Sequence, residues 1–125
     1  IINNIETIKG NSYFTDFNVN TLNKEINISA RYGNINFDLI KNGFEYINIT
    51  SGYSDISLDF DDGSSYNLDI RHVNSFLDIS DKNAKTEKKV LNEEKKEYMT
   101  FGTAGSNPGT AKVKIDASRG NIYIK

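Results

Sequence analysis

The sequence predicts an all-β domain that winds as a β-solenoid with coils of 21 residues. The segment INISARYGNINFDL (26–39) returns 21 residues later as INITSGYSDISLDF (47–60), and weaker copies follow at 68–81 and 113–125. A fixed period of this kind is typical of repeat architectures, in which equivalent residues of successive coils stack. Apolar and polar residues alternate within each copy, which indicates strands buried on one face.

The period aligns apolar residues into four columns. They are Ile26, Ile47, Leu68 and Val113; Ile28, Ile49, Ile70 and Ile115; Ile35, Ile56, Leu77 and Ile122; and Phe37, Leu58, Ile79 and Ile124. β-Branched residues dominate these columns, as a packed and pleated surface favours. We therefore expect Ile28, Ile49 and Ile70 to lie next to one another in successive coils.

A short corner separates the two strands of each copy. Its third position is Gly33, Ser54, Ser75 or Gly120, and its fourth is Asn34, Asp55, Phe76 or Asn121. Glycine and asparagine tolerate left-handed backbone angles, so we expect these positions to make the change of direction, with a different turn at Phe76. An antiparallel sandwich or meander is the alternative fold, but hairpins tolerate drift in spacing and do not demand equal columns.

The chain is predicted to be a single domain over residues 1–125. Residues 1–25 fit the columns only with slips and are expected to form an irregular capping segment, followed by three regular coils over 26–81. An irregular rung over 82–110 holds a charged loop near 82–97 and a strand at 97–102 that is reached through a protruding hairpin. Residues 111–125 form the final coil. A helix is the alternative for the Lys- and Glu-rich stretch, although no 3.6-residue apolar pattern supports it.

Composition narrows the possible functions. The formal net charge is −2 and no basic face stands out, so nucleic acid is not an expected partner. There is no cysteine and only one histidine, His72, which argues against disulfides and multi-histidine metal sites. No apolar run reaches the ~20 residues of a membrane span. The chain begins with Ile1, so we expect a processed or partial chain, with which export is compatible.

The units ARYGNINF, SGYSDISL and ASRGNIYI resemble the Ser-Gly-Asp-Ile repeats of bacterial adhesin families of unknown function, common in envelope proteins of Bacteroidetes. The resemblance covers most of residues 26–125, and it departs from the pattern at Phe76 and in the charged insert. It implies a right-handed β-helix-like fold and an exported protein at the cell surface or in the periplasm. These families supply no catalytic residues to transfer.

Tyr32 and Tyr53 occupy the same corner position one coil apart, so a solenoid would bring their rings side by side. Paired exposed aromatics can bind a sugar ring or an apolar partner surface, and these two are the predicted ligand-binding residues. The alternative is an aromatic ladder that only stabilises the corner.

Acidic residues offer a weaker site. Asp59, Asp61 and Asp62 lie in one turn, and Asp38 should stack beside Asp59, where a calcium ion would relieve the repulsion. The loop lacks the ligand spacing of a calcium motif, so solvated turn residues are expected and no metal or other cofactor is predicted. His72 is expected at the surface or in a corner from general burial preferences. Ser75 and Asp78 lie near it in sequence, but nearness in sequence does not make a catalytic arrangement.

These observations predict a non-catalytic, exported envelope protein, an adhesin or a binding or structural module that recognises a carbohydrate or an envelope protein. A regulatory or scaffolding module of a membrane-linked protein is the first alternative. A polysaccharide-active β-helix enzyme is the second, with Asp38, Asp59, Asp69 and Asp78 as the acids to test.

Overall fold

The protein is all-β. The computed structural model describes residues 2–13, 17–41, 44–61, 64–80, 84–105 and 111–125, and for most of the first 23 residues only the backbone. Its strands are β1 (Ile2–Tyr13), β2 (Phe17–Arg31), β3 (Asn34–Ile40), β4 (Tyr46–Gly52), β5 (Asp55–Phe60), β6 (Tyr66–Val73), β7 (Phe76–Ile79), β8 (Ala84–Asn92), β9 (Glu97–Ala104), β10 (Lys112–Ser118) and β11 (Asn121–Ile124). Within the described ranges no helix is long and apolar enough to cross a bilayer.

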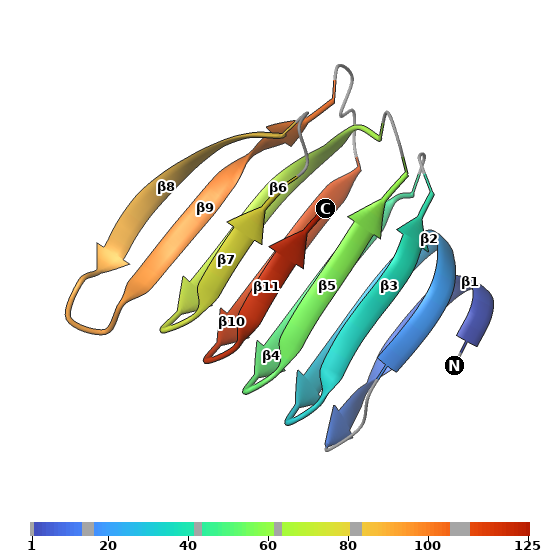
Figure 1. Cartoon of the computed structure of the whole chain (residues 1–125), viewed down its shortest axis with the longest axis horizontal. Helices are drawn as coiled ribbons and strands as arrows, with labels where there is room; N and C mark the ends of the chain where they lie inside the picture. Colours follow the sequence, from blue (N-terminus) through green and yellow to red (C-terminus); the bar gives the residue numbers. More distant parts are fainter. Residues whose placement is uncertain (1, 14–16, 42–43, 62–63, 81–83, 106–110) are drawn as a thin grey trace.

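The strands form two layers that face each other across one core (Figure 1). The front layer contains β3, β5, β11 and β7, and the back layer contains β4, β10, β6, β9 and β8. β2 joins the layers, because residues 17–22 pair with β3 and residues 25–31 pair with β4. The strands pair in parallel, except where β9 lies antiparallel to β6 and to β8.

The register of the parallel strands follows the predicted columns. Ile26 pairs with Ile47 and Ile28 with Ile49 in the back layer, while Ile35 pairs with Ile56 in the front layer. The last copy keeps the same register, since Ile115 pairs with Ile49 and also with Ile70. Side chains of one column therefore touch along the sheet, which explains why each column is apolar throughout.

The order of the strands differs from the expected order. β10 lies between β4 and β6, and β11 lies between β5 and β7, so Ile115 separates Ile49 from Ile70. The expectation that Ile28, Ile49 and Ile70 are successive neighbours is thus correct for the first pair and wrong for the second. The β8–β9 hairpin already occupies the far edge of β6, so β10 pairs with β6 at its other edge.

The corners also differ from expectation. The left-handed residue is the second corner position and not the third or fourth, with φ of 56° at Tyr32, 54° at Tyr53, 48° at Asn74 and 56° at Arg119. The turn before Phe76 uses this same geometry, although a different turn was expected there. Gly120 is required for another reason, because a Cβ there would lie 1.9 Å from the carbonyl oxygen of Ser54.

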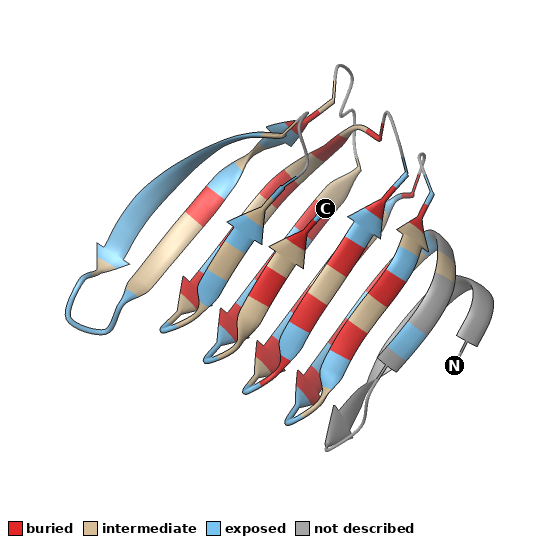
Figure 2. Cartoon of the chain, in the orientation of Figure 1, coloured by how far each residue is buried: buried red, intermediate tan, exposed pale blue. Residues whose placement is uncertain are grey.

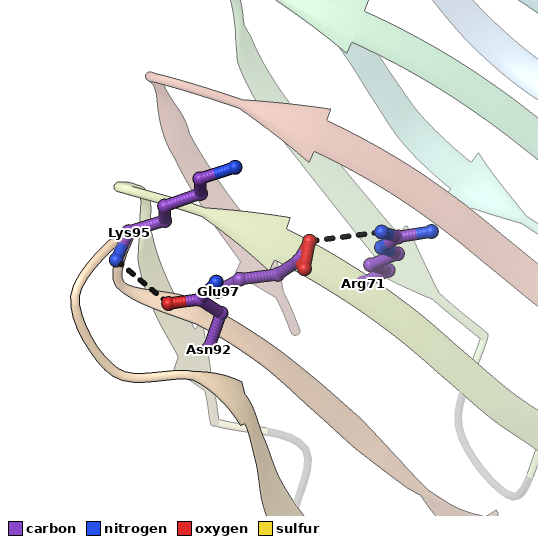
Figure 3. A network of polar contacts seen from close by, with 4 residues as sticks. All are labelled: Arg71, Asn92, Lys95 and Glu97. Atoms are coloured by element: carbon purple, nitrogen blue, oxygen red, sulfur yellow. Dashed lines mark hydrogen bonds and ion pairs between the residues drawn. The ribbon is translucent and has the colours of Figure 1, made fainter.

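The charged insert forms the hairpin through which the strand at 97–102 was expected to be reached. β9 includes the strand that was expected at 97–102, but residues 84–92, expected as a charged loop, form β8 because they pair antiparallel with β9. The hairpin is fixed to β6 by a 2.8 Å ion pair in which Arg71 Nη2 donates to Glu97 Oε2 (Figure 3). At the hairpin turn the side-chain oxygen of Asn92 accepts the N–H of Lys95.

The N-terminal segment that was expected to be irregular is mostly strand. β1 runs parallel to β2 over nearly its whole length, with one register shift between Ile5 and Thr7. β1 therefore lies at the edge of the sheet, next to β2. An edge strand next to the stacked strands is compatible with the capping role that the sequence predicts.

The core lies between the two layers and is closed at one end by aromatic rings. Buried residues alternate with intermediate or exposed ones along β3, β4 and β5, and Figure 2 shows these stripes on β3 and β5. Phe44 precedes β4, Phe60 is the last residue of β5 and Tyr66 is the first residue of β6, and their ring centroids lie 4.2 to 5.9 Å apart. These three residues extend the dry interior beyond the columns that the period predicts.

Candidate functional site

The four left-handed corner residues form one row along the edge of the molecule, which we call the corner ridge: Tyr32, Tyr53, Arg119 and Asn74. Each N–H donates to a carbonyl of the next strand in the row, from Tyr32 to Gly52, from Tyr53 to Ser118 and from Arg119 to Val73, at 2.9 to 3.1 Å. This ladder holds the ridge backbone firmly. The side chains of all four residues are exposed.

Tyr32 and Tyr53 stack as predicted, with ring centroids 5.1 Å apart and planes inclined by 12°. Because β4 lies between β2 and β10, Tyr53 lies between Tyr32 and Arg119. Arg119 places its guanidinium carbon 5.4 Å from the Tyr53 ring centroid and donates a hydrogen bond from Nη1 to the Tyr53 hydroxyl. Both faces of the Tyr53 ring are therefore occupied.

The corner ridge offers a ligand the edges of the tyrosine rings, the tyrosine hydroxyls and the positive charge of Arg119. Each tyrosine remains 45% exposed, although stacking covers ring faces. A sugar ring cannot stack on Tyr53 without displacing a neighbour, so hydrogen bonds and charge must supply recognition here. Arg119 has no carboxylate within 4.0 Å among the described residues, and Arg31 next to Tyr32 is also exposed.

The acidic candidates do not come together. Asp38 and Asp59 are both exposed, and the register of β3 and β5 shifts after Phe37, so these two carboxylates are not a paired rung. Asp38 instead accepts a 2.9 Å hydrogen bond from Asn36. Asp61 is exposed in the turn, and Asp62 lies outside the described residues. Within the described part of the chain, no three His, Cys, Asp or Glu side chains are grouped as metal ligands.

His72 is buried, contrary to the surface position expected from sequence. It lies on β6 and is 3% exposed, and its Nε2 is 3.2 Å from the Thr100 hydroxyl. Burial lowers the pKa of His72, and the charge of Lys88 lowers it further, while the backbone of Ser75 acts weakly in the opposite direction. Its inward direction follows from the β6 alternation, in which Leu68, Ile70 and His72 share one face.

A shallow groove on the outer surface of the back layer was not anticipated. It crosses β10, β6 and β9, has a volume of about 680 Å³, and includes Phe101, Met99, Asp69 and Lys112. Lys112 and Asp69 approach to 3.9 Å at its edge. The groove depends on β9 and β10 flanking β6, and only the missed strand order could have revealed it.

No family model, curated protein or solved structure matches this chain. The resemblance to bacterial adhesin repeats therefore depends on the short sequence motifs alone.

Proposed function

We propose that the chain is a right-handed β-helix-like solenoid that serves as a non-catalytic binding module of the bacterial cell envelope. Its corner ridge is the proposed binding face, and an acidic carbohydrate is the proposed ligand. The observation that carries the proposal is the ridge itself: exposed polar and aromatic side chains repeat along a straight row on a fixed backbone.

Parallel pairing in a constant register supports the solenoid. Front and back strands alternate along the chain from β3 to β7, and neighbouring strands keep equivalent column residues in contact. The corners repeat one geometry four times. An experimental structure that lacks contact between Ile49 and both Ile28 and Ile115 would rule this architecture out.

The chemistry of the ridge supports an acidic carbohydrate. Neighbouring strands are ~4.8 Å apart, so successive ridge side chains can contact successive parts of an extended polymer. Tyrosine hydroxyls and the Asn74 amide exchange hydrogen bonds with sugar hydroxyls, and the Arg119 guanidinium presents donors that fit a carboxylate. Arg31 adds positive charge, whereas Asp55 is engaged by the N–H of Asn121.

Binding to polygalacturonate, measured by isothermal titration calorimetry, tests the proposal, with neutral dextran as the comparison polymer. We expect the protein to bind polygalacturonate more tightly. Arg119→Gln should remove that preference, because it keeps hydrogen-bonding capacity and loses the charge. Lys114→Gln, an exposed change on β10 away from the corner, is the matched control and should leave binding unchanged.

Replacing Tyr32 and Tyr53 together by Ser should weaken carbohydrate binding more than it lowers stability, since the stacked pair contributes about 0.5–1.5 kcal/mol. A large loss of melting temperature with unchanged binding would show an aromatic ladder and no ligand face. A glycan array without any bound sugar would reject the carbohydrate. Envelope location is tested separately by the full-length gene, in which an export signal is expected.

A further inference from the structure

The back layer continues past the front layer at one end of the molecule. Beyond β6 it adds β9 and β8, while the front layer ends at β7, which pairs only with β11 among the described strands (Figure 1). Two strand positions of the front layer, opposite β9 and β8, are thus unfilled by the described residues. We call this region, where β9 and β8 have no front-layer strand opposite them among the described residues, the open end.

Burial declines across the open end strand by strand. The inward row of His72, Tyr98 and Val90 runs from β6 through β9 to β8 in direct register. His72 is buried, Tyr98 is intermediate and Val90 is 54% exposed. Since the same backbone pairing continues, the loss of burial reflects the missing front-layer strands and not a change in the sheet.

None of the described residues pairs with the backbone groups of β7 at this edge. The N–H of Phe76 donates to Gly120 and that of Ser80 donates to Ile124, so these alternate residues point toward β11. In a parallel ladder the intervening residues, Leu77 and Ile79, point their N–H and C=O groups the other way, toward the open end. Their side chains face inward and are only partly buried. An added strand would both pair with these groups and cover these side chains.

The charge of the open end is positive. Lys88 faces inward on β8 with its Nζ 4.1 Å from the Tyr98 ring centroid, and no described carboxylate lies within 4.0 Å of it. A cavity of about 560 Å³ at the corner side of the open end is lined by Lys96 and Arg119 together with Phe76 and Tyr98. An occupant that carries a carboxylate among apolar residues would complement this lining.

We propose that the open end binds an extended, acidic and apolar segment of a partner protein, which adds to β7 as the next strand of the front layer. The cavity shares Arg119 with the corner ridge. The pairing itself uses the β7 edge and Lys88, which the carbohydrate proposal does not use, so the two proposals are tested separately. A second copy does not fit through a twofold β7–β7 contact. Such a contact would bring both β8–β9 hairpins into the same back-layer space.

Fluorescein-labelled peptides TVTETVT and TVTQTVT test the proposal by fluorescence anisotropy with the whole chain. Both should bind, because both can pair with β7, and the Glu peptide should bind up to about fivefold more tightly. Lys88→Met should abolish that difference while preserving binding. Leu77→Pro should abolish binding of both peptides, since it removes an N–H that faces the open end; proline is tolerated on an edge strand. Thr50→Val, exposed on the outer face of β4, is the control and should change nothing.

Peptide-induced shifts in a ¹⁵N NMR spectrum of the unmodified chain decide the matter if Leu77→Pro fails to fold. Shifts at Leu77, Ile79 and the β9 amides support strand addition. No shifts, or shifts confined to the outer face around Phe101, overturn it. A concentration-dependent dimer in light scattering that requires the free β7 edge would also overturn it, by assigning the edge to a second copy.

Discussion

The central strands and the β8–β9 hairpin are both paired through their backbones, the former in parallel and the latter antiparallel, but their side chains are buried to very different extents. β4 is covered by the front layer, and its inward residues Ile47 and Ile49 are fully buried. β8 is paired along its whole length with β9, yet nearly all its side chains are exposed. The comparison teaches that hydrogen bonding makes a strand, whereas a second layer makes a core.

Introducing a carboxylate should give the largest difference in stability between the two regions. Ile49→Asp buries a carboxylate without a partner and is expected to cost more than about 4 kcal/mol, which would unfold the domain. Val90→Asp, on the uncovered face of β8, should change stability by no more than about 0.5 kcal/mol. Urea denaturation measures both. Equal losses would mean that the hairpin is covered in solution.

Disturbing the close backbone contact between neighbouring corners should have the next largest effect on stability. Gly120→Ala places a Cβ 1.9 Å from the Ser54 carbonyl oxygen, so β11 must shift, at an expected cost of about 1–3 kcal/mol. Gly52→Ala is the matched change, because its nearest atoms are 3.4 Å away on the flexible Arg31 side chain. Thermal unfolding should show a clear loss only for Gly120→Ala. A similar loss in both would contradict the close corner packing.

The stability of the protein should depend on pH through His72, which lies on β6, where the hairpin joins the central strands. Its pKa is lowered in the folded protein, so the unfolded chain binds a proton first as the pH falls. Stability should therefore decrease as the pH drops through about 6.5 and level off below the folded pKa. Urea unfolding between about pH 7.5 and about pH 5.5 measures this slope. His72→Gln should flatten it, because the chain has one histidine; an unchanged slope would place the titration elsewhere.

The ion pair that ties the hairpin to the central strands should have the smallest effect. Arg71 is exposed and donates to Glu97, which raises the pKa of Arg71. Arg71→Gln should lower the melting temperature slightly at low salt and not at 1 M salt, where charges are screened over ~3 Å. A loss that persists at high salt would indicate packing of the Arg71 stem instead of its charge.

Much of the site could be foreseen from the period, and part of it could not. Equal spacing placed Tyr32 beside Tyr53, because residues 21 positions apart in this part of the chain lie on adjacent strands. In the order of the sequence Arg119 would follow Asn74 in the row, yet it contacts Tyr53, and this contact occupies the ring face that a sugar would have used. His72 was misplaced because one histidine in an alternating strand gives little signal against general surface preference.

The sequence by itself determined the strands that carry the four apolar columns, the inward direction of those columns and their register, because alternation and a constant spacing can be read along the chain. Only the tertiary structure decided which strands are neighbours. Ile70 and Ile115 belong to one column and present the same apolar surface to Ile49, so the pattern cannot choose between them. The choice depends on the β8–β9 hairpin, which occupies one edge of β6 and leaves the other edge to β10.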